Sequence, residues 1–314
     1  MVTKFVQLKV IQLPFSLISV PIAFALLPNK KQASYLSAFN GIKRRMDELG
    51  LNGLTCSYAI ADFETNIKTC FLQVWPGIAF RHCLFHFKQA IWRKVSISGM
   101  AKVYRIVQNV VFRTFVKATM SLPFVPIARM PEAVEIIKAM GKEMKKLSHV
   151  KFFGNFMNYL QNQWLRHMDE EWLRSWNIYS KTGSSTNNVS EAYNRVFANT
   201  TFFINAHPPI FLWVKVVINE LNQALSKANS SDAGNPEKSN YAVDKKAEKI
   251  NQQRTNLMVQ VGQHTLSMQD YPNSMGHTLI QPDDPVLEDI EHEAERQEKK
   301  KKERRQSHQN VSRK

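Results

Sequence analysis

The chain has 314 residues, and its 42 Lys and Arg against 26 Asp and Glu give a formal net charge of +16. With 44% hydrophobic and 11% aromatic residues it can bury a core, which excludes wholesale disorder. The basic excess favours a polyanionic partner. Its three cysteines, Cys56, Cys70 and Cys83, are an odd number and too few for a disulfide framework, so a secreted fold is disfavoured.

An uncharged stretch near the start, residues 10–29, follows two lysines and has the pattern of a signal peptide or membrane anchor. Pro14 and Pro21 divide this stretch into segments too short to span a bilayer as a helix. We therefore predict two strands, at 5–13 and 17–27, and no membrane association.

Strand and helix patterns alternate in the segments that follow. The expected elements are a helix at 32–49, a strand at 56–61, a helix at 64–74 and a strand at 78–85. From 86 to about 180 the apolar residues recur at helical spacing, interrupted by prolines. This order predicts an α/β sheet with packed helices, followed by an all-helical insertion.

The last third of the chain changes composition in steps. A polar turn at 181–188 leads to a short helix, and a closing helix is expected at 209–228. Residues 229–282 are poor in aromatics and are interpreted as a linker with low helical content. Residues 283–314 form a charged tail, acidic in its first half and basic in its second, which we expect to be solvated.

Two carboxylates are candidates for chemistry. Asp62 directly follows an apolar strand, where a ligand or metal site is common in an open α/β sheet, although an Asp before a helix is also a frequent N-cap. Glu191 lies near the start of the short helix, and its simpler interpretation is an exposed charge favoured by the helix dipole. The residues alone leave both alternatives open.

Cys83 and His86 form a Cys-x-x-His pair at the end of the fourth expected strand. Such a pair can hold one side of a zinc ion, but no second pair nearby completes a tetrahedral site. The other interpretation is a buried cysteine beside a hydrogen-bonded histidine. We do not expect a structural zinc site.

Basic residues gather in two places. The tail carries a nuclear-localisation type run, alternatively a nucleic-acid patch or a solvated helix, made of Lys299, Lys300, Lys301, Lys302, Arg304 and Arg305. In the helical region, basic residues interleave with aromatics in a way compatible with a phosphate-contacting face or with ordinary helix surface: Lys88, Arg93, Lys94, Lys102, Arg105, Arg113 and Lys117.

Five motifs in order and spacing resemble the catalytic domain of Mutator-like element (MULE) transposases. They are FVQL at 5–8, VPIAFALLPNK at 20–30, ADFE at 61–64, HCLFHFKQ at 82–89 with WRKV at 92–95, and STNNVSEAYNR at 185–195 with AHP at 206–208. Each motif is weak alone, but the ordered set is more specific. The resemblance covers roughly residues 4–225.

The resemblance implies a ribonuclease-H-like mixed sheet, formed by 4–85 and 186–200 and split by a helical insertion at 86–180, within a domain of 1–228. In this family three acidic residues bind two Mg²⁺ or Mn²⁺ ions, which take part in DNA cleavage and strand transfer. These reactions are the DNA recombination by which a transposable element moves. Asp62 matches the second acid and Glu191 the third, so their carboxylates are expected within about 8 Å of each other. Cys83, His86, Asn187 and Asn188 match family motif positions around the site.

One departure from the family pattern affects the expected activity. The family's first acid lies upstream of the segment matched by 5–8, and no Asp or Glu precedes Asp47 here, so we expect the opening strand to be missing and the acidic triad to be incomplete. The expectation is a nuclear, transposase-derived, DNA-associated protein that is catalytically inactive and does not bind its metal ions productively. Its expected partners are DNA, bound with weak sequence dependence, and a second copy of the chain.

Two alternatives remain open at this point. The first is an active DDE-type nuclease in which Glu64 substitutes for the missing acid. The second is a nuclear DNA-binding or interaction protein that reuses the scaffold.

Overall fold

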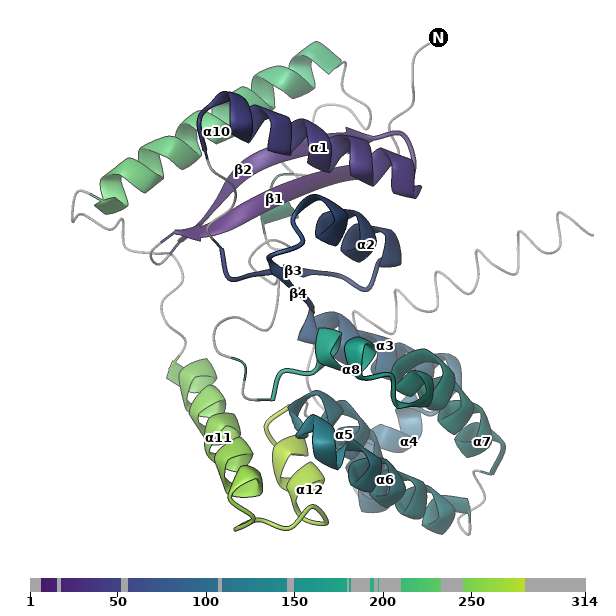
Figure 1. The fold of residues 1–314 in the computed structure, drawn as a ribbon. Helices are drawn as coiled ribbons and strands as arrows, with labels where there is room; N and C mark the ends of the chain where they lie inside the picture. The colour runs from purple at the N-terminus through teal and green to yellow at the C-terminus, as the bar shows by residue number, and fades with distance from the viewer. Residues whose placement is uncertain are drawn as a thin grey trace, which may run out of the picture. The chain divides into compact units, whose positions relative to one another are not determined.

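The structure is a computed structural model that describes residues 7–15, 18–51, 56–106, 109–145, 150–179, 181, 193–194, 197, 210–232 and 245–279. The fold is mixed α/β and mostly helical (Figure 1). The chain forms two compact units. Unit 1 comprises 1–83 and 184–244, and unit 2 comprises 84–183 and 245–314.

Unit 1 begins with an antiparallel hairpin of β1 (Gln7–Phe15) and β2 (Ile18–Leu27). Ile11 pairs with Ala23 and Gln12 with Pro21, so Ile22 is the extra residue of a bulge. A bulge is favoured here because Pro21 has no N–H to give to the ladder. The two strands expected in this region are confirmed.

A βαβ unit follows the first helix. Helix α1 (Gln32–Glu48) ends before Gly50, whose φ of +70° suits a residue without a Cβ. Strand β3 (Tyr58–Ala61), helix α2 (Thr65–Val74) and strand β4 (Ala79–His82) come next, and β3 and β4 pair in parallel. Parallel neighbours need a crossover of this kind, which α2 supplies.

The strands form two separate two-stranded sheets in the described part of the chain, β1 with β2 and β3 with β4. The expected single mixed sheet is therefore not seen as one hydrogen-bonded ladder. The last expected strand, 78–85, is also too long. Its ladder ends where the Cys83 N–H donates to the Ala61 carbonyl at 2.9 Å, and a helix begins at Leu84.

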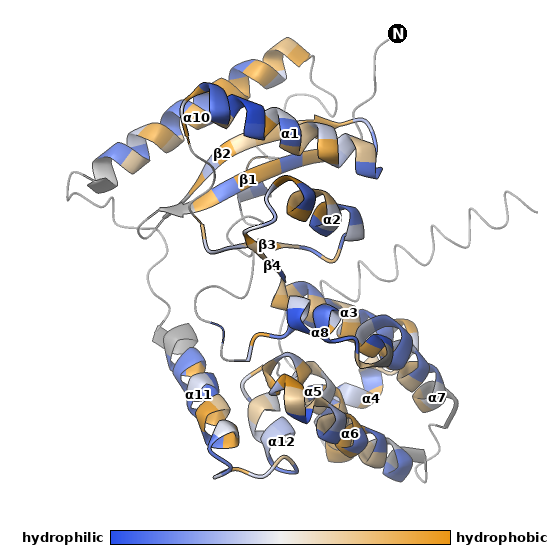
Figure 2. Ribbon diagram, viewed as in Figure 1, coloured by the Kyte–Doolittle hydropathy of each residue, from blue (hydrophilic) through white to orange (hydrophobic). Residues whose placement is uncertain are grey.

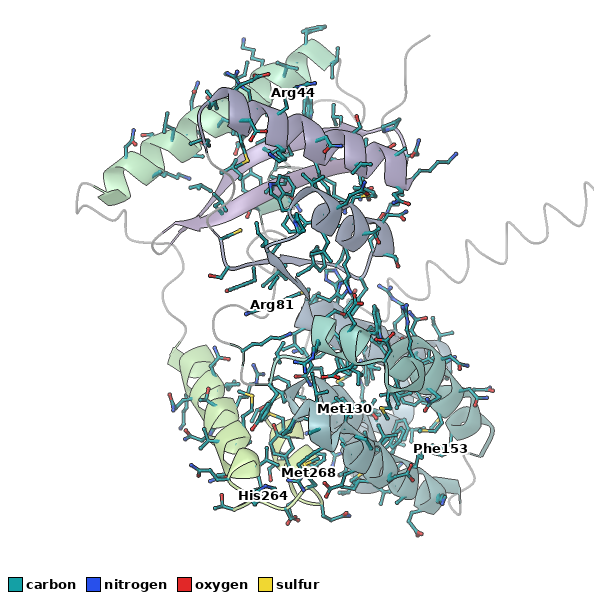
Figure 3. The ribbon with its side chains drawn as sticks, viewed as in Figure 1. Arg44, Arg81, Met130, Phe153, His264 and Met268 are labelled. Carbon is teal, nitrogen blue, oxygen red and sulfur yellow. The ribbon has the colours of Figure 1, made fainter. Side chains whose placement is uncertain are left out.

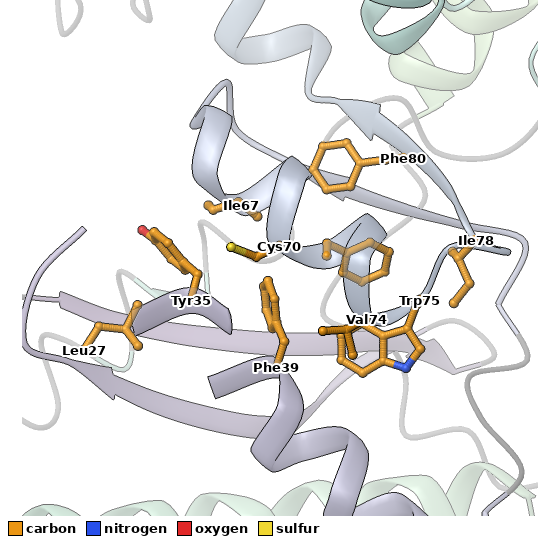
Figure 4. Close-up of a cluster of buried hydrophobic side chains, with 10 residues drawn as sticks. Leu27, Tyr35, Phe39, Ile67, Cys70, Val74, Trp75, Ile78 and Phe80 are labelled. Carbon is orange, nitrogen blue, oxygen red and sulfur yellow. The ribbon is translucent and has the colours of Figure 1, made fainter. Parts of the chain in front are cut away.

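The core of unit 1 lies between the strands and α1 and α2, and Figure 4 shows its side chains. Its buried residues are Leu27, Tyr35, Phe39, Ile67, Cys70, Phe71, Val74, Trp75, Ile78 and Phe80. Side chains alternate along β1 and β2, so Ile11 and Ala25 pack on this core. Phe24 instead contacts the rings of Tyr193 and Phe197, and α10 (Ile210–Asp232) packs on β2.

Unit 2 is built from helices in the described residues. They are α3 (Leu84–Ile97), α4 (Ala101–Arg105), α5 (Val110–Met120), η1 (Leu122–Phe124), η2 (Ile127–Arg129), α6 (Met130–Lys145), α7 (Val150–Tyr159), η3 (Leu160–Leu165), η4 (Arg166–Met168), α8 (Glu170–Trp176), α11 (Lys245–Gly262) and α12 (Tyr271–Gly276). Pro123, Pro126 and Pro131 lie in or beside short turns and helix starts, where a missing N–H is tolerated.

Aromatic side chains fill unit 2. The Phe87 ring lies 4.6 Å from the Trp164 ring and 5.1 Å from the Trp176 ring, and all three side chains are buried. Met130, at the start of α6, is fully buried among the helices (Figure 3). The helix surfaces carry both hydrophilic and hydrophobic residues, as Figure 2 shows for α6 and α7.

Two helices lie in the segment expected to be a linker of low helical content, and that expectation is corrected. In α12 the Tyr271 hydroxyl donates to the Phe124 carbonyl at 2.6 Å, and Val261 at the end of α11 is fully buried. The Arg254 guanidinium on α11 lies over the Phe124 ring and donates to the Thr278 carbonyl. A few side chains of α11 and α12 thus pack on the other helices of unit 2, and the polar residues between them hide the helical pattern in the sequence.

The uncharged stretch near the start folds as the β1–β2 hairpin. Among the residues that the structure describes, no helix is long and apolar enough to span a bilayer. All three cysteines are free thiols.

Candidate acidic site

The end of β3 holds two acidic side chains. Asp62 is the first residue after the strand, and Glu64 comes just before α2. Lys9 on β1 connects them, because its Nζ lies 3.8 Å from Asp62 Oδ2 and 3.5 Å from Glu64 Oε2. Asp62 and Glu64 therefore share one ion-pair partner within the chain, the ammonium group of Lys9.

Glu64 is the more enclosed acid of the two, with 18% of its side chain exposed against 37% for Asp62. Its Oε1 accepts a hydrogen bond of 2.5 Å from the Tyr35 hydroxyl, and its Oε2 also lies 3.6 Å from Lys30 Nζ. Three groups from β1, the β2–α1 connection and α1 thus converge on this carboxylate.

The partners of Glu64 decide its charge. Burial alone would raise the pKa of the Glu64 carboxyl, but the hydrogen bond from Tyr35 and the charges of Lys9 and Lys30 outweigh it and lower the pKa. Burial and the nearby Glu64 carboxylate raise the pKa of the Tyr35 hydroxyl. Glu64 is therefore ionised at neutral pH, and Tyr35 is its hydrogen-bond donor.

Tyr35 also ties this site to the hydrophobic core. Its ring is in the core, with the oxygen at the margin of the cluster in Figure 4, and that oxygen lies 2.7 Å from Gln7 Oε1. Gln7 and Lys9 are two residues apart on β1, so their side chains extend from the same face of the hairpin. This face supplies Lys9 to the two carboxylates and Gln7 to the Tyr35 hydroxyl.

The backbone around Asp62 is fixed by His82 at the end of β4. His82 Nδ1 lies 3.0 Å from the Asp62 carbonyl oxygen, which can only accept, so Nδ1 carries the hydrogen of this bond. The His82 ring also stacks on the Phe63 ring at 4.4 Å. These contacts hold Asp62 where β3 ends, while its Oδ1 is buried without a hydrogen-bond partner in the described residues.

The described residues supply two carboxylates at this point, fewer than the three acids that the resemblance implies for two divalent ions, and Glu191 lies outside them. The structure gathers only Asp62 and Glu64 here, and the described part of the chain holds no group of three His, Cys, Asp or Glu able to hold a metal ion. An ammonium group already lies against both carboxylates. Mg²⁺ needs oxygen ligands at about 2.0–2.1 Å, much closer than the distances to Lys9 Nζ.

Cys83 and His86 are placed without showing a metal function. Cys83 is fully buried at the end of β4, and His86 lies in the first turn of α3, beside the Phe85 ring. The absence of a structural zinc remains a prediction.

Other expected site residues lie outside the described residues: Glu191, Asn187, Asn188 and the basic run from Lys299 to Arg305. The expected approach of Asp62 and Glu191 therefore stays a prediction.

Of the seven basic residues in the helical region, Lys117 is only 7% exposed and is not a surface contact. Burial, together with the charge of Arg113, lowers the pKa of Lys117.

Sequence reasoning did not single out Lys9, Lys30 or Tyr35 as parts of the site. The alternation on β1 contained a signal for Lys9, since a lysine that shares a strand face with the core residue Ile11 needs a partner for its charge. No local signal identified that partner, because Asp62 is 53 positions away in the chain.

Unit 1 is thus an α/β unit in which two carboxylates, those of Asp62 and Glu64, lie where strand β3 ends. Residues 8–90 match the model of the MULE transposase domain, and this segment of the chain is similar to that family. The match includes Asp62, Glu64, Cys83 and His86, and it is shorter than the span of 4–225 expected from the motifs. No curated protein and no solved structure matches the chain significantly.

Proposed function

We propose that this protein is a transposase-derived, nuclear DNA-associated protein that binds DNA without cleaving it. The observation that carries the proposal is the match of residues 8–90 to the MULE transposase domain, a family that acts on DNA. The net charge of +16 supports a polyanionic partner. We propose the ribonuclease-H-like fold as the ancestry of unit 1, in which Asp62 corresponds to the family's second acid and Glu191 to its third.

The binding part of the proposal rests on phosphate contacts. Basic residues on α3, α4 and α5 belong to unit 2, and Lys102 on α4 is exposed. Each phosphate that such a residue neutralises releases counterions, so binding should weaken steeply with salt and depend little on sequence. We expect nonspecific dissociation constants on the order of 10⁻⁴ to 10⁻⁶ M.

The test of binding is fluorescence anisotropy of the full chain with labelled duplex DNA in EDTA, over a range of salt concentrations. Lys102→Gln should flatten the plot of log K against log salt by about one unit if Lys102 contacts a phosphate. Lys138→Gln is the matched control, because Lys138 is exposed on α6 and already paired with Glu135 at 2.7 Å. Absence of any DNA binding at low salt would remove the proposal.

The absence of cleavage is proposed from the charge state of the acidic site. Two-metal catalysis needs carboxylates that hold both ions in line with the scissile phosphate. Here Lys9 lies against the carboxylates of Asp62 and Glu64. Glu64 also accepts a hydrogen bond from Tyr35 and pairs with Lys30. Incubation with Mg²⁺ or Mn²⁺ and terminal-inverted-repeat DNA should therefore give no nicking, beside an Asp62→Ala control.

An active DDE-type nuclease is the second candidate, and one observation favours it. Asp62 and Glu64 meet at the same ammonium group, so Glu64 is close enough to act with Asp62 as a substitute acid. Metal-dependent cleavage that is lost in both Asp62→Asn and Glu64→Gln would establish this candidate.

Nuclear localisation is a separate part of the proposal, supported by the basic run from Lys299 to Arg305. A fluorescent fusion of the full chain should accumulate in the nucleus, and deletion of 299–314 should reduce the accumulation. Unchanged accumulation in the deletion would place the targeting signal elsewhere.

A further inference from the structure

We infer that Lys9 supplies, from within the chain, the positive charge that an acidic site of this kind takes from a divalent ion, and that it thereby excludes the ion. The inference rests on the proposed function, because it explains why a transposase-derived site would bind DNA without cutting it. It concerns the metal and not the DNA, so the two can fail independently.

The position of Lys9 is the first step of the argument. Its Nζ lies 3.8 Å from Asp62 Oδ2 and 3.5 Å from Glu64 Oε2, while 25% of its side chain is exposed. The same Nζ is 5.8 Å from the centre of the Tyr35 ring, which adds a favourable face to a cation. Lys9 is therefore enclosed by two carboxylates and an aromatic ring.

The electrostatic consequence is the second step. Two carboxylates that face one point repel each other when both are ionised, and a partly buried pair needs a compensating cation. Lys9 supplies one positive charge to both acids, and Lys30 supplies a second to Glu64 alone. The described acids thus already have the charge compensation for which a divalent ion would compete.

Distance is the third step. An ion at the Nζ position would need its oxygen ligands about 1.4–1.8 Å closer than the 3.5 and 3.8 Å at which the two carboxylates now lie, since Mg²⁺ coordinates at about 2.0–2.1 Å. Glu64 is restrained against this movement by the 2.5 Å hydrogen bond from Tyr35 to its Oε1. The ammonium group and the divalent ion therefore cannot occupy the site together.

The choice of variant follows from these three steps. Lys9→Met keeps most of the apolar stem and removes the charge, so it frees the carboxylates with little change in packing. Lys9→Gln tests the same change with a polar group, in case the methionine variant does not fold. Lys43→Gln is the control, because Lys43 forms an exposed ion pair with Asp47 on α1 at 3.0 Å.

The experiment is calorimetric titration of the full chain with Mn²⁺ in the absence of DNA, with folding of each variant verified by circular dichroism. The wild type and Lys43→Gln should bind Mn²⁺ no more tightly than about 1 mM, the weak end of protein cation sites. Lys9→Met, or Lys9→Gln, should bind at least about tenfold more tightly, a change of about 1.4 kcal/mol. Adding Asp62→Asn to either variant should abolish the gain.

Two results would overturn the inference. One is tight Mn²⁺ binding by the wild type that Asp62→Asn removes, because Lys9 would then not exclude the ion. The other is a folded Lys9 variant with no gain in Mn²⁺ affinity. The anisotropy measurements in EDTA contain no free metal, so loss of DNA binding would count against the proposed function and leave this inference standing.

Discussion

The two units of the protein stabilise their interiors in different ways. Unit 2 buries stacked and edge-on aromatic rings, with Phe87 between Trp164 and Trp176. Unit 1 has an apolar cluster as well, but Tyr35 at its margin connects that cluster to the ionised Glu64. Enclosing a charged group such as Glu64 beside an apolar cluster costs free energy unless the charge is paired. The comparison indicates that unit 1 keeps an ion-paired carboxylate at the margin of its apolar cluster, whereas the Phe87 cluster of unit 2 is made of aromatic rings.

The largest expected effect is in the aromatic core of unit 2. Phe87→Ala should destabilise the protein by about 3–5 kcal/mol, because a fully buried ring is removed and its neighbours cannot close the cavity. Chemical denaturation followed by tryptophan fluorescence measures this. Ile97→Ala is the control on the same helix, since Ile97 is 49% exposed and should change stability by less than about 0.5 kcal/mol. Equal losses in the two variants would contradict the described core.

A smaller effect is expected where two helices of unit 2 approach closely. A Cβ on Gly141 of α6 would lie 1.5 Å from Cζ of Phe153, so Gly141→Ala should destabilise by about 2 kcal/mol through overpacking. A Cβ added to Gly154 on α7 would meet nothing within 4 Å. Gly154→Ala should therefore stabilise by about 0.5–1 kcal/mol, as alanine does in a helix interior. Thermal unfolding of the pair should show shifts of opposite sign.

A substitution in the acidic site of unit 1 should lower the stability of the protein less than a substitution in the core of unit 2. Glu64→Gln keeps an oxygen for the Tyr35 hydroxyl but removes the charge that faces Lys9 and Lys30, so we expect a loss of about 1 kcal/mol. The control is Glu48→Gln, whose half-exposed carboxylate pairs with Arg45 on the surface and should contribute little. A stability gain in Glu64→Gln would show that the enclosed charges are a net liability to the fold.

The sequence predicted the local parts of this architecture well. The proline-divided apolar stretch indicated strands, and β1 and β2 lie there; Gly50 indicated a helix end, and α1 ends beside it. Each of these patterns acts over a few residues, where backbone sterics and side-chain periodicity decide the outcome.

Contacts between distant segments were harder to predict. Asp62 was recognised from its place after a strand, but its contact with Lys9 depends on how β1 lies near the end of β3. The helices α11 and α12 were missed because their burial depends on Tyr271 reaching the Phe124 carbonyl, 147 positions away. Neither contact leaves a periodic pattern in its own segment.

The smallest expected effect is the pH dependence of unit 1, and it sharpens the comparison with Glu64→Gln. The folded protein lowers the pKa of Glu64 from its ordinary value of about 4.5, so the folded state favours the ionised carboxylate more than the unfolded chain does. The resulting stability is fully present above the unfolded pKa and is lost as the pH falls through the lower folded pKa. Urea denaturation of the wild type and Glu64→Gln should therefore show a constant difference in unfolding free energy from pH 6 to 7, which shrinks progressively below about pH 4.5. A difference that grows on acidification would mean that Glu64 is held in its neutral form.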